Sequence, residues 1–473
     1  MTLTSDPTIS AVVDRLRDGF HGRVLTRDDA DFETAAGTMY VPADTEPLVV
    51  AQVADVDDVV RVVDTARETG LPIAIRSGGH SGAGFGRVAD GIVLDVRGLD
   101  TLDIDSDART AWAGSGLTAG AYTEAAQEHG LATGFGDTGS VGLGGIITGG
   151  GIGYLTRLHG LTIDSLLAAE VVTADGTVHL VDAEHEPDLF WAVRGAGANV
   201  GVVTRFLLRL HPLPEVTGGM LILPATPDVV AGFLAAAEAA PDELSTIANV
   251  MPCPPMPFVP EAHHGELVVF GMLCYAGPPD AGLPALAPFR ALAEPIADLL
   301  GPTTYASFFP PEDPDYHPTA IARTIFVDDL DRPSVERLVE HLATFDAPMR
   351  VAQLRVLGGA ASRVPVEATA YAHRERRIMG AIAAFYEGED DRAVKQAWVD
   401  ATAADLPLAP GQYVNFVNDE GEAGVHAAYP GATWDRLAAI KGRYDPTNLF
   451  RRNQNVRPAS DERAPDRIHV HKV

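Results

Sequence analysis

The stretch Arg76-Ser77-Gly78-Gly79-His80-Ser81-Gly82-Ala83-Gly84 determines how the rest of this chain is interpreted. It directly follows the apolar run Leu71–Ile75, so the sequence predicts a buried strand that ends in a tight loop. Glycines in such a loop let the main chain approach a ligand closely and direct several N–H groups at one anion. A histidine among glycines has little to pack against, so we expect His80 to face a ligand. A solvated His80 in an ordinary glycine-rich turn is the alternative.

Two further glycine-rich segments have the same character. Residues 139–153 contain GxGxxG spacing, but no βαβ unit with a ribose-binding acid follows, so a dinucleotide-binding turn is poorly supported. Close approach to a large ligand explains this glycine density, and a helix packed through small residues is the alternative. Residues 188–204 predict a short helix, a glycine turn and a strand, in which Arg194 faces a phosphate or pairs with an acidic side chain. Three such loops favour a large, phosphate-bearing cofactor.

Size and charge restrict the classes of protein that this chain can belong to. Its 473 residues, 46% of them hydrophobic, are long for one core and predict two domains. A net charge of −30 argues against nucleic acid and anionic membranes as partners. No run of 18 apolar residues and no signal-like start at Met1–Pro7 are present, so we expect no membrane span and no secretion. Cys253 and Cys274 are expected to be free thiols in a reducing compartment, the cytoplasm.

Apolar periodicity and turn signals predict an α+β chain. Helices are expected at 57–69, 117–129, 227–239, 282–299, 332–344, 389–404 and 434–444. Strands are expected at 92–96, 166–173, 177–181, 201–210, 218–223, 245–251, 266–275, 349–357 and 413–416. Asp175-Gly176 between two of these strands is typical of a hairpin. Pro212 and Pro214 mark a boundary, so we expect domains at 1–215 and 216–410 and a returning segment at 411–473, with an antiparallel sheet covered by helices in the middle.

Four groups of motifs, taken together and in order, give the chain a resemblance to a known family. They are Arg76–His80, residues 139–153 followed by Gly160–Asp164, Asp188–Gly197, and Tyr413–Phe416 with Arg443–Phe450 and Arg452–Val456. The chain resembles the vanillyl-alcohol-oxidase superfamily of flavoproteins, with its PCMH-type FAD-binding fold, and within it the berberine-bridge-enzyme-like oxidases. The similarity covers about residues 40–215 and 410–457. The middle is similar mainly in pattern, nearest at Arg363–Pro365 and Ala370–Arg374.

The resemblance implies FAD joined covalently to the protein through a ring nitrogen of His80. Many relatives carry a second tether, a cysteine, at the position that Thr138 occupies here, so a single linkage is expected. Val141 stands where a small residue accompanies reaction with dioxygen, although a generic apolar contact is the alternative. The cofactor-binding residues implied are Arg76, Ser77, Gly78, Gly79, His80, Ser81, Gly82, Thr138, Gly139, Val141, Gly142, Gly144, Gly145, Gly149, Gly150, Gly153, Gly201, Val203, Tyr413, Asn453 and Asn455.

The same resemblance makes Tyr413 the candidate catalytic base. Hydride removal is easier if the substrate's O–H or N–H proton also leaves, and a phenolate can accept it. Because free tyrosine has a pKa near ~10, nearby donors or positive charge must lower the pKa of Tyr413. Asn415, two residues on along the expected strand face, is placed to help, and Gln353 with Arg355 would form the pocket floor. Packing in a strand and exposed polar alternation are the alternatives.

The expected function is FAD-dependent oxidation of an alcohol- or amine-bearing carbon in a small molecule, a sugar or a natural product, with dioxygen reduced to hydrogen peroxide. A dehydrogenase on the same scaffold that passes electrons to another acceptor is the alternative, and a flavin-binding protein with a decayed site is a third possibility. Tyr371, His373 and Arg374 bind substrate or cap a helix. The pair His263-His264 lacks partners at ligand spacing, so no metal is expected. The sequence does not indicate an oligomeric state.

Overall fold

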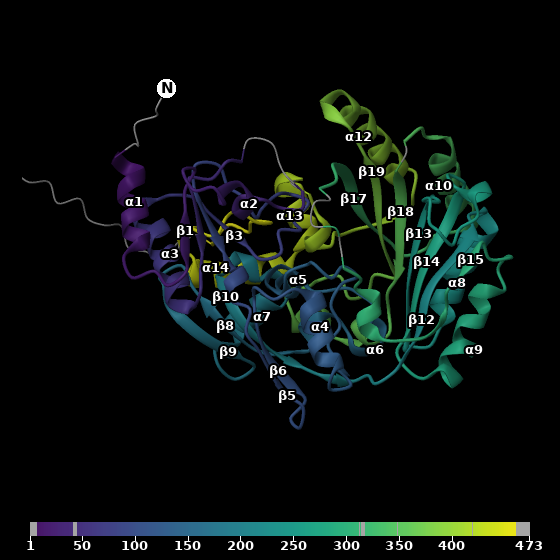
Figure 1. Ribbon diagram of the computed structural model, residues 1–473, viewed down its shortest axis with the longest axis horizontal. Coiled ribbons are helices and arrows are strands. Elements are labelled where there is room, and N and C mark those ends of the chain that lie inside the picture. Colours follow the sequence, from purple (N-terminus) through teal and green to yellow (C-terminus); the bar gives the residue numbers. More distant parts are fainter. Residues whose placement is uncertain are drawn as a thin grey trace, which may run out of the picture.

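A computed structural model describes residues 7–40, 45–311, 313, 317–347, 349–418 and 420–459. The expectation for the start of the chain therefore falls largely outside the described residues, as do residues 460–473 of the expected C-terminal segment. The described chain forms two lobes (Figure 1). One lobe holds two smaller sheets and both ends of the described chain, and the other is built on a large antiparallel sheet. Within the described residues, no helix is long and apolar enough to cross a membrane.

The first small sheet carries the loop that opens the glycine-rich region. Its strands lie in the order β1 (Arg23–Leu25), β2 (Val49–Gln52), β4 (Ile92–Asp95), β3 (Ile73–Arg76), and β2, β4 and β3 are parallel. The helices of this part are α1 (Pro7–Arg17), α2 (Phe32–Ala36) and α3 (Val56–Thr69). Asp55 accepts a hydrogen bond from the backbone N–H of Asp58 at the start of α3, and Gly70 ends it with φ +72°. The predicted helix at 57–69 is thus confirmed to within one residue.

The second small sheet contains the predicted hairpin. Its order is β5 (Leu102–Asp105), β6 (Thr110–Gly114), β10 (Val202–Arg209), β8 (Leu166–Val172), β9 (Val178–Asp182), all antiparallel. Asp175 and Gly176, with φ +82°, form the turn between β8 and β9, as the sequence predicts. This lobe also contains α4 (Ala119–Gln127), α5 (Leu143–Gly149), α7 (Pro187–Ala196), α13 (Gly421–Ala428), α14 (Ala432–Tyr444) and the pair β7 (Leu131–Ala132) and β11 (His211–Pro212). Helix α6 (Thr156–His159) lies next to the large sheet, in contact with β13.

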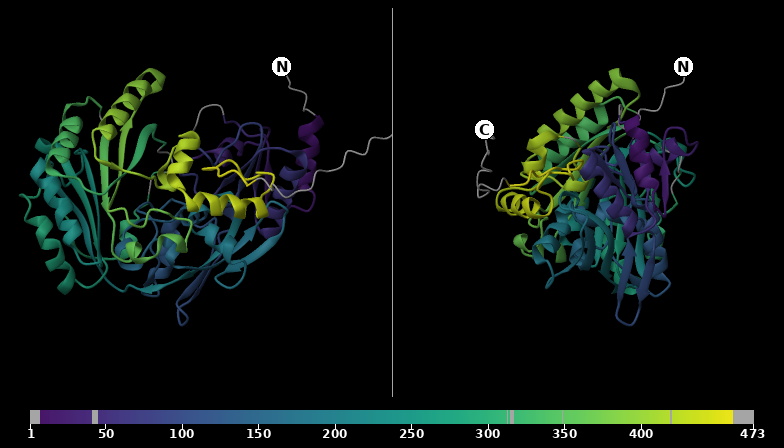
Figure 2. Two further views of the ribbon diagram at one scale, coloured as in Figure 1. Left: turned by 180° about the vertical axis from the view of Figure 1, so that it is seen from behind. Right: turned by 90° about the vertical axis from the view of Figure 1, so that its left-hand side faces the viewer.

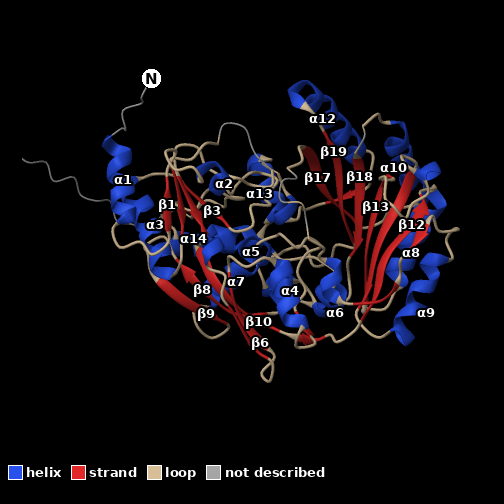
Figure 3. Cartoon of the chain, in the orientation of Figure 1, coloured by secondary structure: helices blue, strands red, loops and turns tan. Residues whose placement is uncertain are grey.

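The large sheet is antiparallel and has nine strands over the described residues. Eight follow the order β15 (Ala297–Asp298), β12 (Val216–Pro224), β14 (Leu267–Tyr275), β13 (Leu244–Pro252), β18 (Arg350–Val356), β19 (Ile378–Phe385), β17 (Ala320–Val327), β20 (Leu408–Ala409), and β16 (Gly301–Thr303) also pairs with β12. The helices α8 (Pro227–Ala239), α9 (Pro279–Arg290), α10 (Arg332–Thr344) and α12 (Gly388–Ala404) cover its outer face (Figure 3). A buried core of aliphatic and aromatic side chains fills the space between them.

Several elements predicted after residue 216 need correction. The helix expected at 282–299 is α9 at Pro279–Arg290, because Ala297 and Asp298 pair with β12 instead. Strands β17 and β19 were not predicted at all. The strand expected at 413–416 is a 3₁₀ turn, Val414–Phe416, with Tyr413 at its N-cap. The chain then returns through α13 and α14 to the lobe of the small sheets, as the yellow segment of Figure 2 shows.

Candidate active site

One cavity, with a volume of about 540 Å³, lies between the glycine-rich loops and the inner face of the large sheet. One wall comes from residues 73–86, 136–152, 196–203 and 450–454, and the opposite wall comes from β17, β18 and β19. Most predicted site residues line it: Arg76, Ser77, Gly78, Gly79, His80, Ser81, Gly82, Thr138, Val141, Gly142, Gly144, Gly145, Gly149, Gly201, Val203, Gln353, Tyr413, Asn415 and Asn453. Gly139, Gly150, Gly153 and Asn455 do not line it. A second hollow near Gly22 and Arg97 contains none of the predicted residues.

The first two glycine-rich loops are locked together by backbone contact. A Cβ on Gly78 would lie 2.3 Å from the backbone nitrogen of Gly142, and a Cβ on Gly142 would lie 2.1 Å from Ser77 Oγ. Ser77 Oγ also donates to the carbonyl of Ser115, at 2.7 Å, and anchors the end of β3 to the strand region beyond β6. Some of the glycines expected to approach a ligand are therefore required first for loop-to-loop packing.

His80 lies half-buried at the rim of these loops and lines the cavity. Its Nε2 lies 2.8 Å from Ser140 Oγ, which belongs to the second loop. Gly79 has φ +76°, a left-handed conformation that a residue with a side chain rarely adopts, and it turns the chain just before the histidine. The two loops thus set the position and the ring orientation of His80.

The second glycine-rich segment contains the short helix α5. The sequence suggested either a backbone surface for a large ligand or a helix packed through small residues, and α5 has features of both. Gly144, Gly145 and Gly149 face the cavity, and a Cβ on Gly145 would meet no atom within 4 Å. A Cβ on Gly149 would lie 1.9 Å from Asn415 Oδ1, so the absence of a side chain here makes room for Asn415. The helix is both a small-residue packing element and an open backbone surface for a ligand.

Tyr413 is buried, with 2% of its surface exposed, and its hydroxyl oxygen accepts two hydrogen bonds. The donors are the backbone N–H of Gly151, at 2.9 Å, and Asn415 Nδ2, at 3.0 Å. Asn415 Nδ2 also donates to the carbonyl of Ile146, at 3.1 Å, which ties the turn to α5. Although the expected strand is wrong, the 3₁₀ turn still brings the Asn415 amide to the phenol.

The balance of influences on the Tyr413 phenol differs from the expectation. Burial is the largest and raises the pKa of Tyr413 above its ordinary value, while the hydrogen bonds from Gly151 and Asn415 and the nearby charge of Arg355 act to lower it. The hydrogen-bond donors and the positive charge that were expected to lower the pKa of Tyr413 are present. Their combined effect is smaller than that of burial, so the pKa of Tyr413 is raised. A proton acceptor of this kind works best at alkaline pH.

A polar network occupies one corner of the cavity. Arg355 Nη2 lies 2.6 Å from Asp137 Oδ2 and donates to Gln353 Oε1 at 2.7 Å, and Arg355 Nη1 donates to the carbonyl of Ile152. Gln353 Nε2 donates to Asn249 Oδ1 at 2.9 Å. Gln353 and Arg355 share a face of β18 as predicted, but sequence reasoning missed Asp137 and Asn249. Asp137 directly precedes Thr138, so its position in the glycine-rich region was the available signal.

Tyr371, His373 and Arg374 lie behind Tyr413 and do not line the cavity. Arg374 forms a two-pronged ion pair with Asp164, at 2.6 and 2.8 Å, and its side chain is fully buried. His373 Nε2 lies 3.0 Å from the carbonyl of Ala428, and burial lowers the pKa of His373 to about 4. The Tyr371 ring packs edge-on against Tyr413 with centroids 6.0 Å apart. Of these three residues, Tyr371 contacts Tyr413, and His373 and Arg374 pack against Tyr371.

The C-terminal return adds the last part of the wall. Asn453 Nδ2 donates to the carbonyls of Ala198 and Phe450, at 2.6 and 3.0 Å, and Asn453 Oδ1 is a buried oxygen without a partner among the described residues. Asn455 Oδ1 instead accepts from Lys441 Nζ at 2.8 Å, outside the cavity. The orphaned oxygen of Asn453 is the kind of group that a bound ligand N–H or O–H satisfies.

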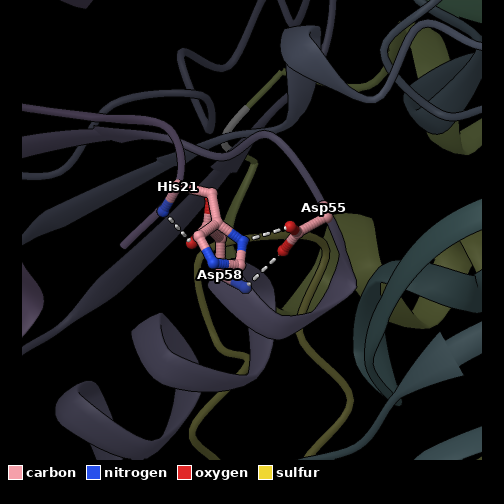
Figure 4. Close-up of side chains that lie close together, drawn as sticks. All are labelled: His21, Asp55 and Asp58. Carbon is pink, nitrogen blue, oxygen red and sulfur yellow. Dashed lines mark hydrogen bonds and ion pairs between the residues drawn. The ribbon is translucent and has the colours of Figure 1, made fainter. Parts of the chain in front are cut away.

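A histidine with two carboxylates lies close together at the start of α3 (Figure 4). His21 Nδ1 lies 2.5 Å from Asp55 Oδ2. The Asp58 carboxylate accepts from the backbone N–H groups of His21, Gly22 and Ala54 at 2.8, 2.9 and 2.9 Å. Asp55 caps the helix. These contacts use the carboxylate oxygens to join the start of α3 to the residues just before β1, and we interpret the cluster as a helix cap.

The comparisons with known proteins agree with this geometry. Residues 47–182 match the FAD binding domain family, and residues 412–457 match the berberine and berberine-like family. The (R)-6-hydroxynicotine oxidase of Paenarthrobacter nicotinovorans is 28% identical over 92% of this chain and 97% of its own length. An FAD-linked oxidoreductase of Dictyostelium discoideum is 28% identical over 87% of this chain and 89% of its length.

Solved structures resemble the whole chain. The crystal structure of 6-hydroxy-D-nicotine oxidase from Arthrobacter nicotinovorans superposes with a TM-score of 0.83 at 25% identity, covering 97% of this chain and all of that one. The BBE-like 1 protein of Physcomitrella patens gives 0.84 at 22% identity over 94% and 99% of the two chains, and a chitooligosaccharide oxidase gives 0.81 at 21% over 96% and 100%. The last two show the fold alone. The chain is an FAD-linked oxidoreductase that carries matches to an FAD binding domain and to a berberine-like domain, and it has the fold of the berberine-bridge-enzyme-like flavoproteins.

Proposed function

We propose that this enzyme is an oxidase that removes a hydride from an alcohol- or amine-bearing carbon of a small organic substrate and uses dioxygen as the final acceptor. The carrying observation is that one cavity brings together His80 and three glycine-rich segments on one wall and Tyr413 with Asn415 beside them. The oxidase relative that acts on 6-hydroxynicotine, by its name, supports the reaction class.

The residues present fit FAD. Asn453 Oδ1 is an orphaned acceptor in the cavity wall. Arg76 and Arg452 also line the cavity, although the guanidinium of Arg76 donates to the Ala35 carbonyl and that of Arg452 donates to the carbonyls of Arg87 and Gly84. The open backbone at Gly145 allows close approach by a flat ring system. We assign the covalent tether to His80 alone, since Thr138 cannot form a thioether. Bound FAD supplies the hydride acceptor, and its reoxidation by dioxygen releases hydrogen peroxide.

Tyr413 is assigned as the group that takes the substrate proton at its hydroxyl oxygen. The N–H donors of Gly151 and Asn415 stabilise the ionised phenol, and the guanidinium of Arg355 adds a favourable charge. Because burial raises the pKa of Tyr413, the fraction in the accepting form grows with pH, and turnover should rise toward alkaline pH. Val141, at the cavity wall, is small enough to leave the approach of dioxygen open.

Acid precipitation of the purified holoenzyme tests the cofactor assignment. We expect yellow colour in the protein pellet of the wild type and in the supernatant of the His80→Ala variant. Release of flavin from the wild type into the supernatant would refute the covalent linkage. A folded preparation that contains no flavin would overturn the FAD assignment. The Thr138→Ser variant serves as the matched control, because it changes the second-tether position without touching the histidine.

The electron acceptor is tested separately, by following reoxidation of the reduced holoenzyme in air-saturated buffer. Rapid reoxidation with one hydrogen peroxide formed per flavin supports the oxidase. Slow reoxidation in air together with fast reduction of a quinone dye would instead establish the dehydrogenase alternative. The strongly negative chain also makes nucleic acid and anionic membranes poor partners, and we propose a cytoplasmic location with a small molecule as the substrate.

A further inference from the structure

The inner face of the large sheet, opposite the glycine-rich loops, carries alanine or valine at five of the nine positions that line the cavity. The cavity-facing positions of β17, β18 and β19 are Ala320, Ala322, Thr324, Val351, Gln353, Arg355, Ala381, Ala383 and Phe385. We call the six apolar members of this set the alanine floor: Ala320, Ala322, Val351, Ala381, Ala383 and Phe385. The alternate positions, such as Ile321 and Ile382, point the other way into the helix-covered core.

The register makes the alanine floor continuous. Val351 pairs with Ala383, and Ala383 pairs with Ala322, so three small residues form a row across neighbouring strands. Ala320 lies opposite Phe385 in the next row. Side chains this short leave space above the sheet, and a flat molecule can lie against such a surface over a wide area.

The alanine floor offers almost no hydrogen bonds to a ligand. Its side chains are apolar, and β19 pairs along its length with β17 on one side and β18 on the other, so its backbone groups are used in the sheet. Thr324 Oγ1, the neighbouring hydroxyl, donates to the carbonyl of Phe416 at 2.8 Å. A sugar lying on this surface would bury hydroxyl groups without partners, which opposes binding.

The polar groups of this wall are gathered at one corner and are occupied with one another. Gln353 Oε1 accepts from Arg355, Gln353 Nε2 donates to Asn249, and the charge of Arg355 is balanced by Asp137. The cation of Arg355 also lies over the Phe416 ring, 5.2 Å from its centroid. The cavity therefore has one polar end and one broad apolar surface. Such a shape fits an elongated, largely apolar ligand whose single reactive alcohol or amine lies near Tyr413.

We infer that the substrate is a flat, largely apolar polycyclic alcohol or amine rather than a sugar, and that Ala322 and Ala383 decide this preference. The inference rests on the proposed oxidase function, because it names the substrate class of that same cavity. Larger side chains at these two positions would fill the space that a ring system needs.

The test measures binding apart from chemistry. Anthracene-9-carboxamide, a flat tricyclic probe with no oxidisable alcohol, is titrated into the holoenzyme, and quenching of its fluorescence with perturbation of the flavin spectrum reports the dissociation constant. Saturable binding that a large excess of cellobiose does not displace is expected. In the Ala383→Leu variant the probe should bind more weakly by about tenfold or more. Ala235→Leu, on the exposed face of α8, is the matched control and should bind as the wild type does.

Three outcomes would overturn the inference: no saturable binding of the probe, displacement by cellobiose, or unchanged binding in Ala383→Leu with the flavin spectrum retained. If Ala383→Leu loses its fold or its flavin, the measurement is repeated with Ala322→Leu, whose position pairs with Ala383 on the neighbouring strand. This variant must also weaken probe binding. A failure of the proposed function looks different: probe binding as expected, but no hydrogen peroxide formed when 9-anthracenemethanol is supplied in air.

Discussion

Removal of the Asn415 amide should move the ionisation of Tyr413, the proposed catalytic base, by a measurable amount. Asn415 Nδ2 lies 3.0 Å from Tyr413 Oη. A hydrogen bond to an ionised oxygen contributes about 1.5–3 kcal/mol, and one to a neutral oxygen about 0.5–1.5 kcal/mol. The difference, about 1.4 kcal/mol, corresponds to about one pKa unit. In Asn415→Ala the apparent pKa of the base should therefore rise by about one unit, while the Gly151 N–H remains in place.

The assay is the pH dependence of kcat/KM measured through oxygen consumption. Below the ionisation, the variant should be about tenfold slower than the wild type, and at the alkaline plateau the two should converge, since the ionised base is then present in both. The lost bond to the Ile146 carbonyl would lower the rate at every pH instead, so the shape of the profile separates the two effects.

Asn418→Ala is the matched control. It removes the same side chain three positions on, where the amide nitrogen donates to the carbonyl of Ala322 and not to Tyr413. Its rate can change, but its apparent pKa should stay at the wild-type value. An unshifted or lowered pKa in Asn415→Ala, or an equal loss of rate across the whole pH range, would refute the assignment of Tyr413 as the ionising base.

Three further changes test other parts of the structure. Asp137→Asn leaves the charge of Arg355 unbalanced, so the pH–rate profile should move toward acid, and a shift toward alkali would contradict the electrostatic argument. Burial lowers the pKa of His373 to about 4 from 6.5, so the unfolded chain binds the extra proton between these values and stability falls as pH falls through that window. The loss is about 3 kcal/mol, and His373→Gln should flatten urea-unfolding stability against pH there. Lys441→Met strands the buried Asp445 carboxylate, and urea unfolding at neutral pH should show a loss of about 3–5 kcal/mol; a smaller loss would mean that the carboxylate is protonated.

The sequence was sufficient where local signals agree with the fold. Helix α3 has a capping aspartate, helical spacing of valines and a glycine stop, and the hairpin of β8 and β9 has Asp-Gly at its turn. The glycine-rich loops and His80 could be assigned to one ligand site because dense glycines around a histidine are an uncommon local pattern. Such signals need no knowledge of distant parts of the chain.

Other features depend on partners far away in the sequence. Strand β19 contains Gly380 and three alanines, a composition with low strand propensity, and it forms because β17 and β18 pair with it on both sides. The turn at Tyr413–Phe416 is rich in β-forming residues but is held by contacts to Gly151 and to Ile146 of α5, 262 and 269 residues earlier. Asp137 joins the site only because β18 brings Arg355 to it.

The position of residues 450–456 has a consequence for how this enzyme is made. Asn199 Nδ2 donates to the carbonyl of Gln454, and its Oδ1 accepts from the backbone N–H of Val456, across separations of 255 and 257 residues. At a synthesis rate of about 5–20 residues per second, the wall near Asn199 leaves the ribosome roughly 10–50 s before the segment that completes it. A flavin that needs this completed wall should therefore bind only after residues 450–456 have been made, and ribosome-bound or prematurely terminated chains should accumulate as colourless protein exposed to proteases.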